Sequence, residues 1–305
     1  MLFLFLDGVG LGPDDPERNP FSVADMPTMA DLLEGRRLVE GSAPSEGQRA
    51  TLLAVDAQMG VEGAPQSATG QAALLTGENV PELVGEHYGP KPNPAVAEIV
   101  RRDNLFKKVL ARGGSAALLN GYPPRYFEAI KSGVRLYSSI PLAATSAGLE
   151  LMTVQDMRDG KAFSADFTGA GWSEQPGFPS IPIYDPAQAG RLLARAAESY
   201  DLAWFDFWPS DFAGHRREMT PAIALLENLD AVLGGLVEAW GARSDLIVVS
   251  SDHGNLEDLS QRGHTLNPVP GMLIGPMEMR RGFASELKDL TSFAPAILKT
   301  LYGSP

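Results

Sequence analysis

The side chains of this sequence that are suited to binding metal ions lie next to short apolar runs. Six of them flank such runs: Asp7, Asp211, His215, Asp252, His253 and His264. The fourth histidine of the chain, His87 in GEHYGP, is interpreted as a surface residue. Imidazole nitrogen together with carboxylate oxygen suits Zn, Mn or Fe, whereas Mg and Ca prefer oxygen alone. The set therefore predicts a site for two divalent metal ions, with Mn or Zn as the expected metals.

Each of these residues also has an ordinary structural explanation. Asp7 precedes a glycine, where aspartate often begins a turn. Asp211 and His215 are four residues apart, which places them on one helical face, as in many pairs of surface neighbours. Asp252 and His253 could form a capped turn before Gly254. The interpretation as metal ligands depends on the six occurring together in a chain without cysteine, which has no thiolate ligand to offer.

A serine in the segment GAPQSATGQAALLTG is the candidate nucleophile. Ser67 precedes a stretch of good helix formers, so it could act simply as the N-cap of a helix. The same position also suits catalysis, because a helix N-terminus and a bound cation both stabilise an alkoxide and so activate a weak hydroxyl. Thr69 is the alternative nucleophile in this segment. The sequence thus predicts catalysis by Ser67, with helix capping as the competing explanation.

The elements that carry these residues alternate between strands and helices. Continuous apolar runs, typical of buried parallel strands, occur at 2–6, 115–119, 202–207, 246–250 and 271–274. Helical patterns occur at 68–76, 105–111, 186–198, 221–240 and 292–301. This alternation predicts an α/β fold with a mostly parallel sheet and helices on both faces, and such sheets bind ligands at the carboxyl ends of their strands. We expect a metal-binding core of residues 1–125 and 185–305, with residues 126–184 as a small insertion, lid or irregular lobe.

Composition and charge argue against several other classes of protein. The formal net charge is −13, and no run of lysine and arginine reverses it locally, which argues against nucleic-acid binding. No apolar stretch is long enough to span a bilayer. The apolar start LFLFL is too short for a signal peptide and lacks a basic leader, so it is expected to form a buried strand. We expect a soluble, cytoplasmic protein that binds neither nucleic acid nor membranes.

Five motifs, in order along the chain, resemble those of the alkaline phosphatase superfamily. They are LDGVG with Asp7, QSATGQ with Ser67, the D-x-x-x-H of Asp211 and His215, SDHGN at 251–255, and GHTLNPVP at 263–270. Within the superfamily they look most like the metalloenzyme domain of cofactor-independent phosphoglycerate mutases and phosphopentomutases. The resemblance implies an alkaline-phosphatase-like core in which one metal ion is held by Asp7, Ser67, Asp252 and His253. The other would be held by Asp211, His215 and His264, and Asp211 rather than Asp206 has the required spacing to His215.

The resemblance also implies a reaction on a small phosphorylated substrate. Ser67, as a metal ligand, would attack phosphorus in line, and water or a second hydroxyl would then resolve the phosphoseryl intermediate. The mutases insert a large cap domain where this chain has only residues 78–104, and Gln71 stands where they have a histidine. A short cap exposes the intermediate to water, which favours hydrolysis. Arg125 in GYPPRYF is interpreted as a surface residue rather than a phosphate ligand.

We therefore expect a two-metal-dependent phosphoester hydrolase, either a phosphatase or a phosphodiesterase. The alternative is a phosphomutase of phosphoglycerate or sugar-phosphate type, which the segment 126–184 could support by acting as a different lid. The second alternative is a non-catalytic protein that keeps the metal ions for stability alone. Such a structural role would not explain a serine at a helix N-terminus beside two metal sites.

Overall fold

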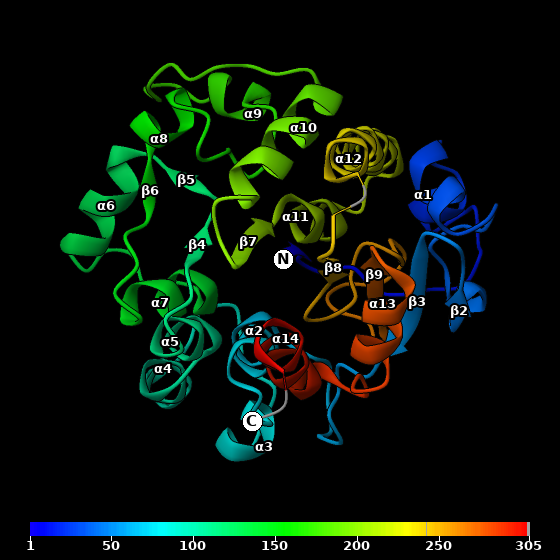
Figure 1. Cartoon of the computed structure of the whole chain (residues 1–305), viewed down its shortest axis with the longest axis horizontal. Coiled ribbons are helices and arrows are strands. Elements are labelled where there is room, and N and C mark those ends of the chain that lie inside the picture. The colour runs from blue at the N-terminus through cyan, green and yellow to red at the C-terminus, as the bar shows by residue number, and fades with distance from the viewer. Residues whose placement is uncertain (242, 304–305) are drawn as a thin grey trace.

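A seven-stranded sheet crosses the centre of the molecule, in a computed structural model that describes residues 1–241 and 243–303 (Figure 1). The strand order is β2-β3-β9-β8-β1-β7-β4. The strands are β1 (Leu2–Leu6), β2 (Ser45–Glu46), β3 (Ala50–Val55), β4 (Ala116–Leu118), β7 (Leu202–Phe207), β8 (Ile247–Ser250) and β9 (Val269–Ile274). Strands β8, β1, β7 and β4 are parallel, whereas β9, β3 and β2 continue the sheet with antiparallel pairings. The predicted α/β class is confirmed, and the sheet is mixed on one side.

Helices connect the strands. The longer ones are α2 (Ser67–Thr76), α4 (Pro94–Arg102), α10 (Pro186–Ala197), α12 (Met219–Trp240) and α14 (Phe293–Tyr302). The shorter ones are α1 (Pro27–Leu32), α3 (Val80–Val84), α5 (Leu105–Ala111), α6 (Pro124–Lys131), α7 (Ser139–Ser146), α8 (Val154–Arg158), α9 (Ala170–Ser173), α11 (Pro209–Arg216) and α13 (Met277–Ala284). Single 3₁₀ turns are η1 (Pro20–Ser22), η2 (Glu40–Ser42) and η3 (Leu290–Ser292). None of the described helices combines the length and the apolar character needed to cross a membrane.

Strand β1 is buried on both faces because its side chains alternate between two helical layers. Leu4 packs in the layer that contains α10 and α12. Phe3 and Phe5 pack in the opposite layer, with α2, α5 and α14. The Phe3 ring also stacks on Trp204 of β7, with 4.0 Å between the ring centroids. Figure 1 shows these layers on opposite sides of the sheet, which explains why the run LFLFL is apolar throughout.

Every strand and helix expected from the sequence is present, with bounds that shift by at most two residues. The sequence patterns do not indicate β3, which pairs with β9 in the antiparallel part of the sheet. Its segment ATLLAV includes Thr51, the half-buried Leu53 and the exposed Ala54. Only the two-residue strand β2 lies beyond it at that edge. The strand is therefore less apolar than the central ones, and its pattern is correspondingly weak.

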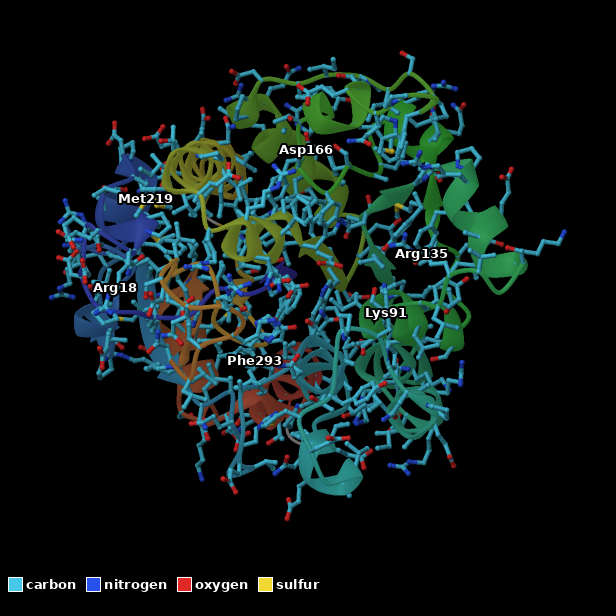
Figure 2. The ribbon with its side chains drawn as sticks, turned by 180° about the vertical axis from the view of Figure 1, so that it is seen from behind. Arg18, Lys91, Arg135, Asp166, Met219 and Phe293 are labelled. Atoms are coloured by element: carbon cyan, nitrogen blue, oxygen red, sulfur yellow. The ribbon has the colours of Figure 1, made fainter. Side chains whose placement is uncertain are left out.

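A second, two-stranded sheet lies beside the edge strand β4. It pairs β5 (Gly121–Tyr122) with β6 (Met152–Thr153) in parallel. A small apolar cluster supports it, formed by Val154, Met157, Ala162 and Trp172. Figure 2 shows Asp166 of this region well separated from Phe293 of α14. Helix α7, in contrast, packs in the main core with α2 and α4. The division into a core of 1–125 and 185–305 and a lobe of 126–184 stays a prediction.

Candidate two-metal centre

All of the candidate ligands lie at one edge of the sheet, where the parallel strands end. Asp7 directly follows β1, Asp211 lies in α11 after β7, and Asp252 follows β8. His264 precedes β9, but β9 is antiparallel to β8, so the beginning of β9 lies at the same edge. Strand β3 is antiparallel to β9 and ends at this edge too, so the chain reaches Ser67 from there. The mixed sheet thus collects residues from five segments at one place.

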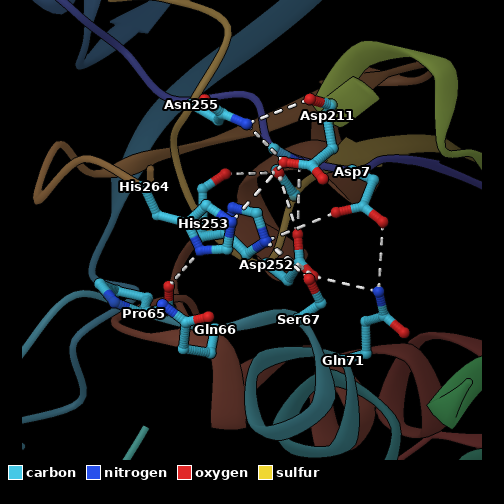
Figure 3. A network of polar contacts seen from close by, with 12 residues as sticks. Asp7, Pro65, Gln66, Ser67, Gln71, Asp211, Asp252, His253, Asn255 and His264 are labelled. Atoms are coloured by element: carbon cyan, nitrogen blue, oxygen red, sulfur yellow. Dashed lines mark hydrogen bonds and ion pairs between the residues drawn. The ribbon is translucent and has the colours of Figure 1, made fainter. Parts of the chain in front are cut away.

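The first group of candidate ligands is almost entirely shielded from solvent, and we call Asp7, Ser67, Asp252 and His253 the buried cluster. Asp252 and His253 are 0% exposed, Ser67 7% and Asp7 9%. His253 is central: its Nε2 lies 3.0 Å from the Ser67 hydroxyl oxygen and 3.5 Å from Asp7 Oδ1 (Figure 3). The same nitrogen lies 3.6 Å from Asp252 Oδ2. Four potential ligand atoms therefore face one small volume.

Backbone carbonyl groups determine which ring nitrogen of two histidines is free. His253 Nδ1 lies 3.3 Å from the Gly254 carbonyl oxygen, and His264 Nδ1 lies 2.7 Å from that of Pro65. A carbonyl oxygen can only accept, so Nδ1 of each ring donates, and in the neutral ring Nε2 keeps its lone pair. The two rings also stack with 3.6 Å between their centroids. Both histidines thus present a nitrogen in the form that binds a metal ion.

Ser67 is the first residue of α2 rather than its N-cap. Gln66 occupies the N-cap position, and the Ser67 hydroxyl interacts with His253 instead of capping backbone N–H groups. The alternative nucleophile, Thr69, is 0% exposed, and its hydroxyl donates to the backbone oxygens of Gln66 at 3.2 Å and Tyr88 at 3.3 Å. Thr69 therefore fixes a neighbouring loop, whereas Ser67 places its oxygen at a helix N-terminus and inside the buried cluster.

The second group, Asp211, His215 and His264, is more accessible, and we call it the open cluster. Asp211 and His215 lie on one face of α11, with 3.3 Å between Asp211 Oδ2 and His215 Nε2. His264 Nε2 approaches the other carboxylate oxygen, Oδ1, at 3.8 Å. The His215 side chain is 47% exposed and that of His264 8%. Asp211 therefore lies between two imidazoles, one of which faces solvent.

Without a cation the buried cluster contains no positive group that would stabilise its two carboxylates in their ionised form. Burial raises the pKa of Asp7 well above its usual value, and the neighbouring Asp252 raises it further. Burial and then Asp211 raise the pKa of Asp252. Burial, with the nearby His264, lowers the pKa of His253 to about 3, so this ring is neutral at pH 7. A divalent cation would stabilise both carboxylates in their ionised form.

The residues present fit such cations. Two sets of three ligand atoms lie within 4.8 Å of one another, namely Asp7, Asp252 and His253 in one and Asp211, His253 and His264 in the other. Asp7 Oδ1 is buried and has no hydrogen-bond partner among the residues that the structure describes. Leaving such an oxygen without a partner costs free energy that a bound cation would recover. His215, expected as a ligand of the second ion, is not a member of the second set. It contacts this set only through Asp211.

Two glycines allow these segments to come so close. Gly8 has a φ of 68°, and a Cβ atom there would lie 2.6 Å from Asp211 Oδ1. A Cβ atom on Gly70 of α2 would lie 2.9 Å from Cβ of Asp252. Any larger residue at either position would push apart the segments that carry the ligands.

Two amide side chains hold the carboxylates in place. Gln71 Nε2 donates to Asp252 Oδ2 at 3.2 Å and to Asp7 Oδ2 at 3.4 Å. In the sequence, Gln71 is noticeable only because the mutases have a histidine at this position. Asn255 Nδ2 donates to Asp211 Oδ1 at 2.6 Å. Asn255 belongs to the motif SDHGN, so the motif contains a supporting residue as well as two candidate ligands.

Glu257 connects the loops around the centre, although the sequence does not single it out. It is 0% exposed, and its Oε2 accepts the backbone N–H groups of Gly10 at 2.9 Å and Asn255 at 2.8 Å. Its Oε1 accepts from the Thr265 hydroxyl and, at 3.0 Å, from Asn267 Nδ2. One carboxylate thus joins the loops after β1, after β8 and before β9. Only its position two residues beyond SDHGN could have suggested this role.

His87 and Arg125, which the sequence analysis interprets as surface residues, lie outside both clusters. His87 is half-buried, with its Nε2 3.2 Å from the Val61 carbonyl oxygen, and burial lowers its pKa. The guanidinium of Arg125 is exposed and lies over the Phe178 ring, 3.8 Å from its centroid. Arg125 thus packs against Phe178 rather than lying near either cluster.

Comparison with known proteins supports the resemblance indicated by the motifs. Residues 185–304 match the model of the Metalloenzyme superfamily. A 2,3-bisphosphoglycerate-independent phosphoglycerate mutase from Desulforudis audaxviator is 35% identical over 135 residues, which are 40% of this chain and 26% of that enzyme. The PH0037 protein from Pyrococcus horikoshii has the same fold, with a TM-score of 0.56, 12% identity and coverage of 100% of this chain and 97% of that one. A cold-active alkaline phosphatase from Shewanella sp. also shares it, with a TM-score of 0.53, 12% identity and coverage of 99% and 100%.

The part of this chain that matches the Metalloenzyme superfamily model carries the open cluster, Asp252 and His253. The whole chain has an alkaline-phosphatase-like fold, and its similarity to phosphoglycerate mutases is confirmed in sequence. The match spans only about a quarter of the curated relative's length, 26%.

Proposed function

We propose that this protein is a metal-dependent enzyme that transfers a phosphoryl group from a small phosphomonoester, with Ser67 as the nucleophile. The observation that carries the proposal is the position of the Ser67 hydroxyl. It lies at the N-terminus of α2, 3.0 Å from His253 Nε2 and inside a cluster of buried metal-ligand side chains. A structural serine has no need of that environment.

The two clusters would hold two divalent cations, for which Mn and Zn are the candidates. In the proposed assignment the buried cluster binds one ion, and Asp211, His215 and His264 bind the other. When bound, the two cations stabilise the charge that develops on the attacking and leaving oxygens.

The chain's own residues then carry out the transfer and set the direction in which the alcohol departs. Ser67 Oγ forms a bond to phosphorus while the bond from phosphorus to the ester oxygen breaks, and the proton lost by the serine ends on the departing alcohol. Because Ser67 belongs to the buried cluster, in-line attack points the alcohol toward the open cluster and solvent. The N-terminus of α2 stabilises negative charge on the serine oxygen. Gln71 keeps the two carboxylates beside it in a fixed orientation.

The acceptor that removes the phosphoryl group from Ser67 decides between two activities. The name of the curated relative favours a second substrate hydroxyl, as in a phosphomutase. One structural observation favours water instead: the 47% exposed side chain of His215 opens the centre to solvent. We therefore propose the mutase, which was the alternative to the hydrolase expected from the sequence, as the better supported of the two, with the hydrolase as the second candidate. A cytoplasmic location and the absence of nucleic-acid or membrane partners stay predictions.

The deciding experiment incubates metal-stripped protein with Mn, Zn or Mg and a panel of phosphomonoesters, including both phosphoglycerates. Inorganic phosphate release is measured in parallel with isomer formation by ³¹P NMR. Metal-dependent isomer formation without phosphate release supports the mutase, and release of phosphate supports the hydrolase. If no metal supports either reaction on any ester, the proposed function is wrong.

A further inference from the structure

The basic residues of this acidic protein are unevenly distributed. Residues 91–135 contain nine lysines and arginines but only three aspartates and glutamates, a net charge of +6 in a chain whose formal net charge is −13. The basic residues occur singly and in pairs over α4, α5, α6 and the loops around them, so they form no continuous run. Figure 1 shows these helices grouped with α7 beyond the edge strand β4. This end of the molecule therefore attracts anions more strongly than the rest of the surface.

A cavity of about 310 Å³ opens between these helices. One wall consists of α4 and the residues just before it, and the other consists of the end of α6, the loop between α6 and α7, and α7 itself. Its apolar lining includes Pro94, Ile130, Leu136 and Leu142. The volume lies at the lower end of the range for small-molecule sites, so the cavity has room for a small organic ligand.

Two arginines, one from each wall, line this cavity. Arg101 lies in the last turn of α4, and Arg135 lies in the loop between α6 and α7. Arg102, the residue next to Arg101, is paired with Glu78 at 2.7 Å. Neither Arg101 nor Arg135 forms an ion pair with any residue that the structure describes, and both are exposed. A guanidinium group can bind a carboxylate or a phosphate through two parallel hydrogen bonds, so the two arginines suit an anionic ligand.

The loop that carries Arg135 is anchored to the rest of the molecule. The backbone N–H of Arg135 donates to the Ala129 carbonyl oxygen of α6 at 3.0 Å, and its guanidinium lies 5.0 Å from the Tyr126 ring centroid. The next residue, Leu136, lines the cavity and is nevertheless 63% exposed. The cavity thus combines an anchored positive charge with apolar surface that a ligand could remove from water.

The cavity is distinct from the two-metal centre, but one loop contacts both. None of the candidate metal ligands lines the cavity. The loop between α3 and α4 lines it at Pro92 and Asn93. Three residues before Pro92, the same loop reaches α2, because a Cβ atom on Gly89 would lie 3.2 Å from the backbone nitrogen of Ser67. A ligand in the cavity would therefore contact a loop that packs on the helix of the proposed nucleophile.

We propose that this cavity binds a small organic anion, whose carboxylate or phosphate group is held by Arg101 and Arg135 and whose apolar part covers Leu136. This site goes beyond the proposed function, because it needs neither the metal ions nor Ser67. The acidic group of the ligand supplies the negative charge that no described carboxylate of the chain offers to the two guanidinium groups. Since the arginines come from different elements, the bound anion would connect α4 with the loop between α6 and α7.

The test measures the binding of three probes to the Mn-loaded protein by isothermal titration calorimetry. Benzoate carries a carboxylate on an apolar ring, phenylphosphonate carries a phosphorus oxyanion on the same ring, and benzyl alcohol carries the ring without a charge. We expect at least one of the two anions to bind about tenfold or more tightly than benzyl alcohol, because only an anion pairs with the arginines. The tighter of the two identifies the acidic group that the cavity prefers. If neither anion binds more tightly than benzyl alcohol, the proposal is wrong.

Substitution of the arginines locates the bound anion. Arg101→Gln and Arg135→Gln should each weaken its binding by about tenfold. Arg102→Gln is the matched control, because it makes the same change one residue along α4, at a side chain that is paired with Glu78 and does not line the cavity. Its affinity should stay within about twofold of wild type. Equal losses in all three variants would indicate general attraction to positive charge, and unchanged binding in Arg101→Gln and Arg135→Gln would place the anion elsewhere. Either result would overturn the proposal.

The failure of this inference can be told apart from that of the proposed function. Ser67→Ala and Asp252→Asn should bind the anion like the wild type, since neither residue lines the cavity. This expectation holds whether or not Ser67 is the nucleophile. Loss of anion binding in Asp252→Asn, or after removal of Mn, would show that the anion binds at the two-metal centre and would contradict a separate site.

Discussion

The two clusters of the candidate centre differ in their access to water and in their charge. In the buried cluster Asp252 and His253 are 0% exposed, whereas in the open cluster the His215 side chain is 47% exposed. The buried cluster contains two carboxylates, one imidazole and a hydroxyl, while the open cluster contains one carboxylate and two imidazoles. The buried cluster thus surrounds the Ser67 hydroxyl with two carboxylates that are shielded from solvent, whereas the open cluster has one carboxylate and is partly exposed. In the proposed function, this difference separates the part of the site that performs chemistry from the part that admits substrate.

The largest expected effect comes from Ser67, the nucleophile proposed in the buried cluster. Replacing Ser67 with alanine should lower kcat by on the order of 10⁴-fold or more, since loss of a nucleophile removes the covalent pathway. The metal content, measured by inductively coupled plasma mass spectrometry, should stay at two ions because the carboxylates and imidazoles remain. Thr69→Val is the matched control. Its activity should match that of the wild type as long as the loop that contains Tyr88 keeps its position. Near-normal turnover in Ser67→Ala would move the chemistry away from the buried cluster.

A pair of ligand substitutions tests the difference between the clusters directly. Asp252→Asn removes a fully buried carboxylate, so we expect one ion to be lost and activity to stay low even in excess Mn. His215→Asn removes a half-exposed imidazole, for which water can substitute, so we expect metal affinity to fall by about 10- to 100-fold. Its activity should therefore recover at high metal concentration. Activity is measured against free Mn concentration, alongside equilibrium dialysis. The same metal dependence in both variants would show that the clusters are equivalent.

Much of this centre could be predicted from the sequence because it is built from strand ends. Asp7, Asp252 and the α11 pair each follow an apolar run, and a largely parallel sheet places such residues together. The antiparallel direction of β9 was not predicted, yet it is what brings His264, which precedes its strand, to the same edge. The supporting roles of Gln71 and Glu257 could not be predicted. Both residues act through hydrogen bonds, and in the sequence they resemble any other polar residue of a helix or loop.

Residues that meet through the tertiary fold alone could not be predicted at all. The loop that contains Tyr88 reaches the first turn of α2 through backbone and hydroxyl hydrogen bonds with Thr69. Asp206 appeared in the sequence only as a competitor for the role of Asp211. Its strand lies between β1 and β4, and Asn120 holds its backbone through two hydrogen bonds. Periodicity and spacing report which face of an element is buried, but they do not report which charges are buried together.

Removal of the metal ions should have a moderate effect on stability, and the buried cluster should account for most of it. A ligand at 100 times its dissociation constant stabilises the folded state by about 2.7 kcal/mol, and each kcal/mol shifts Tm by about 2–4 °C in a protein of this size range. We expect a chelator to lower Tm by about 5–10 °C in differential scanning calorimetry. The shift should nearly vanish in Asp252→Asn and persist in His215→Asn. An equal shift in all three proteins would mean that the ions do not bind at these residues.

The smallest expected effect is the pH dependence that buried charge imposes on the metal-free protein. Burial raises the pKa of Asp206 to about 7, with a further increase from Asp252 and an opposing contribution from Lys91. Its usual value is 3.8, so between about pH 4 and pH 7 the folded state holds a proton that the unfolded state has released. The stabilisation from this proton is complete below pH 4 and is lost as the pH rises through 7. Asp206→Asn, which stays neutral, should therefore match the wild type near pH 4 and exceed its free energy of unfolding by about 1–3 kcal/mol at pH 8.

Urea unfolding in the presence of a chelator, at pH 4.5, 6 and 8, measures this difference as a function of pH. Asp14→Asn is the control: its exposed side chain, like other surface positions, should change stability by no more than about 0.5 kcal/mol at any pH. Saturating Mn should reduce the advantage of Asp206→Asn, because cations bound nearby stabilise the ionised carboxylate. A constant difference between Asp206→Asn and wild type across the pH range would show that ionisation of Asp206 does not contribute. The difference in charge between the buried cluster and the open cluster would then depend on Asp7 and Asp252 alone.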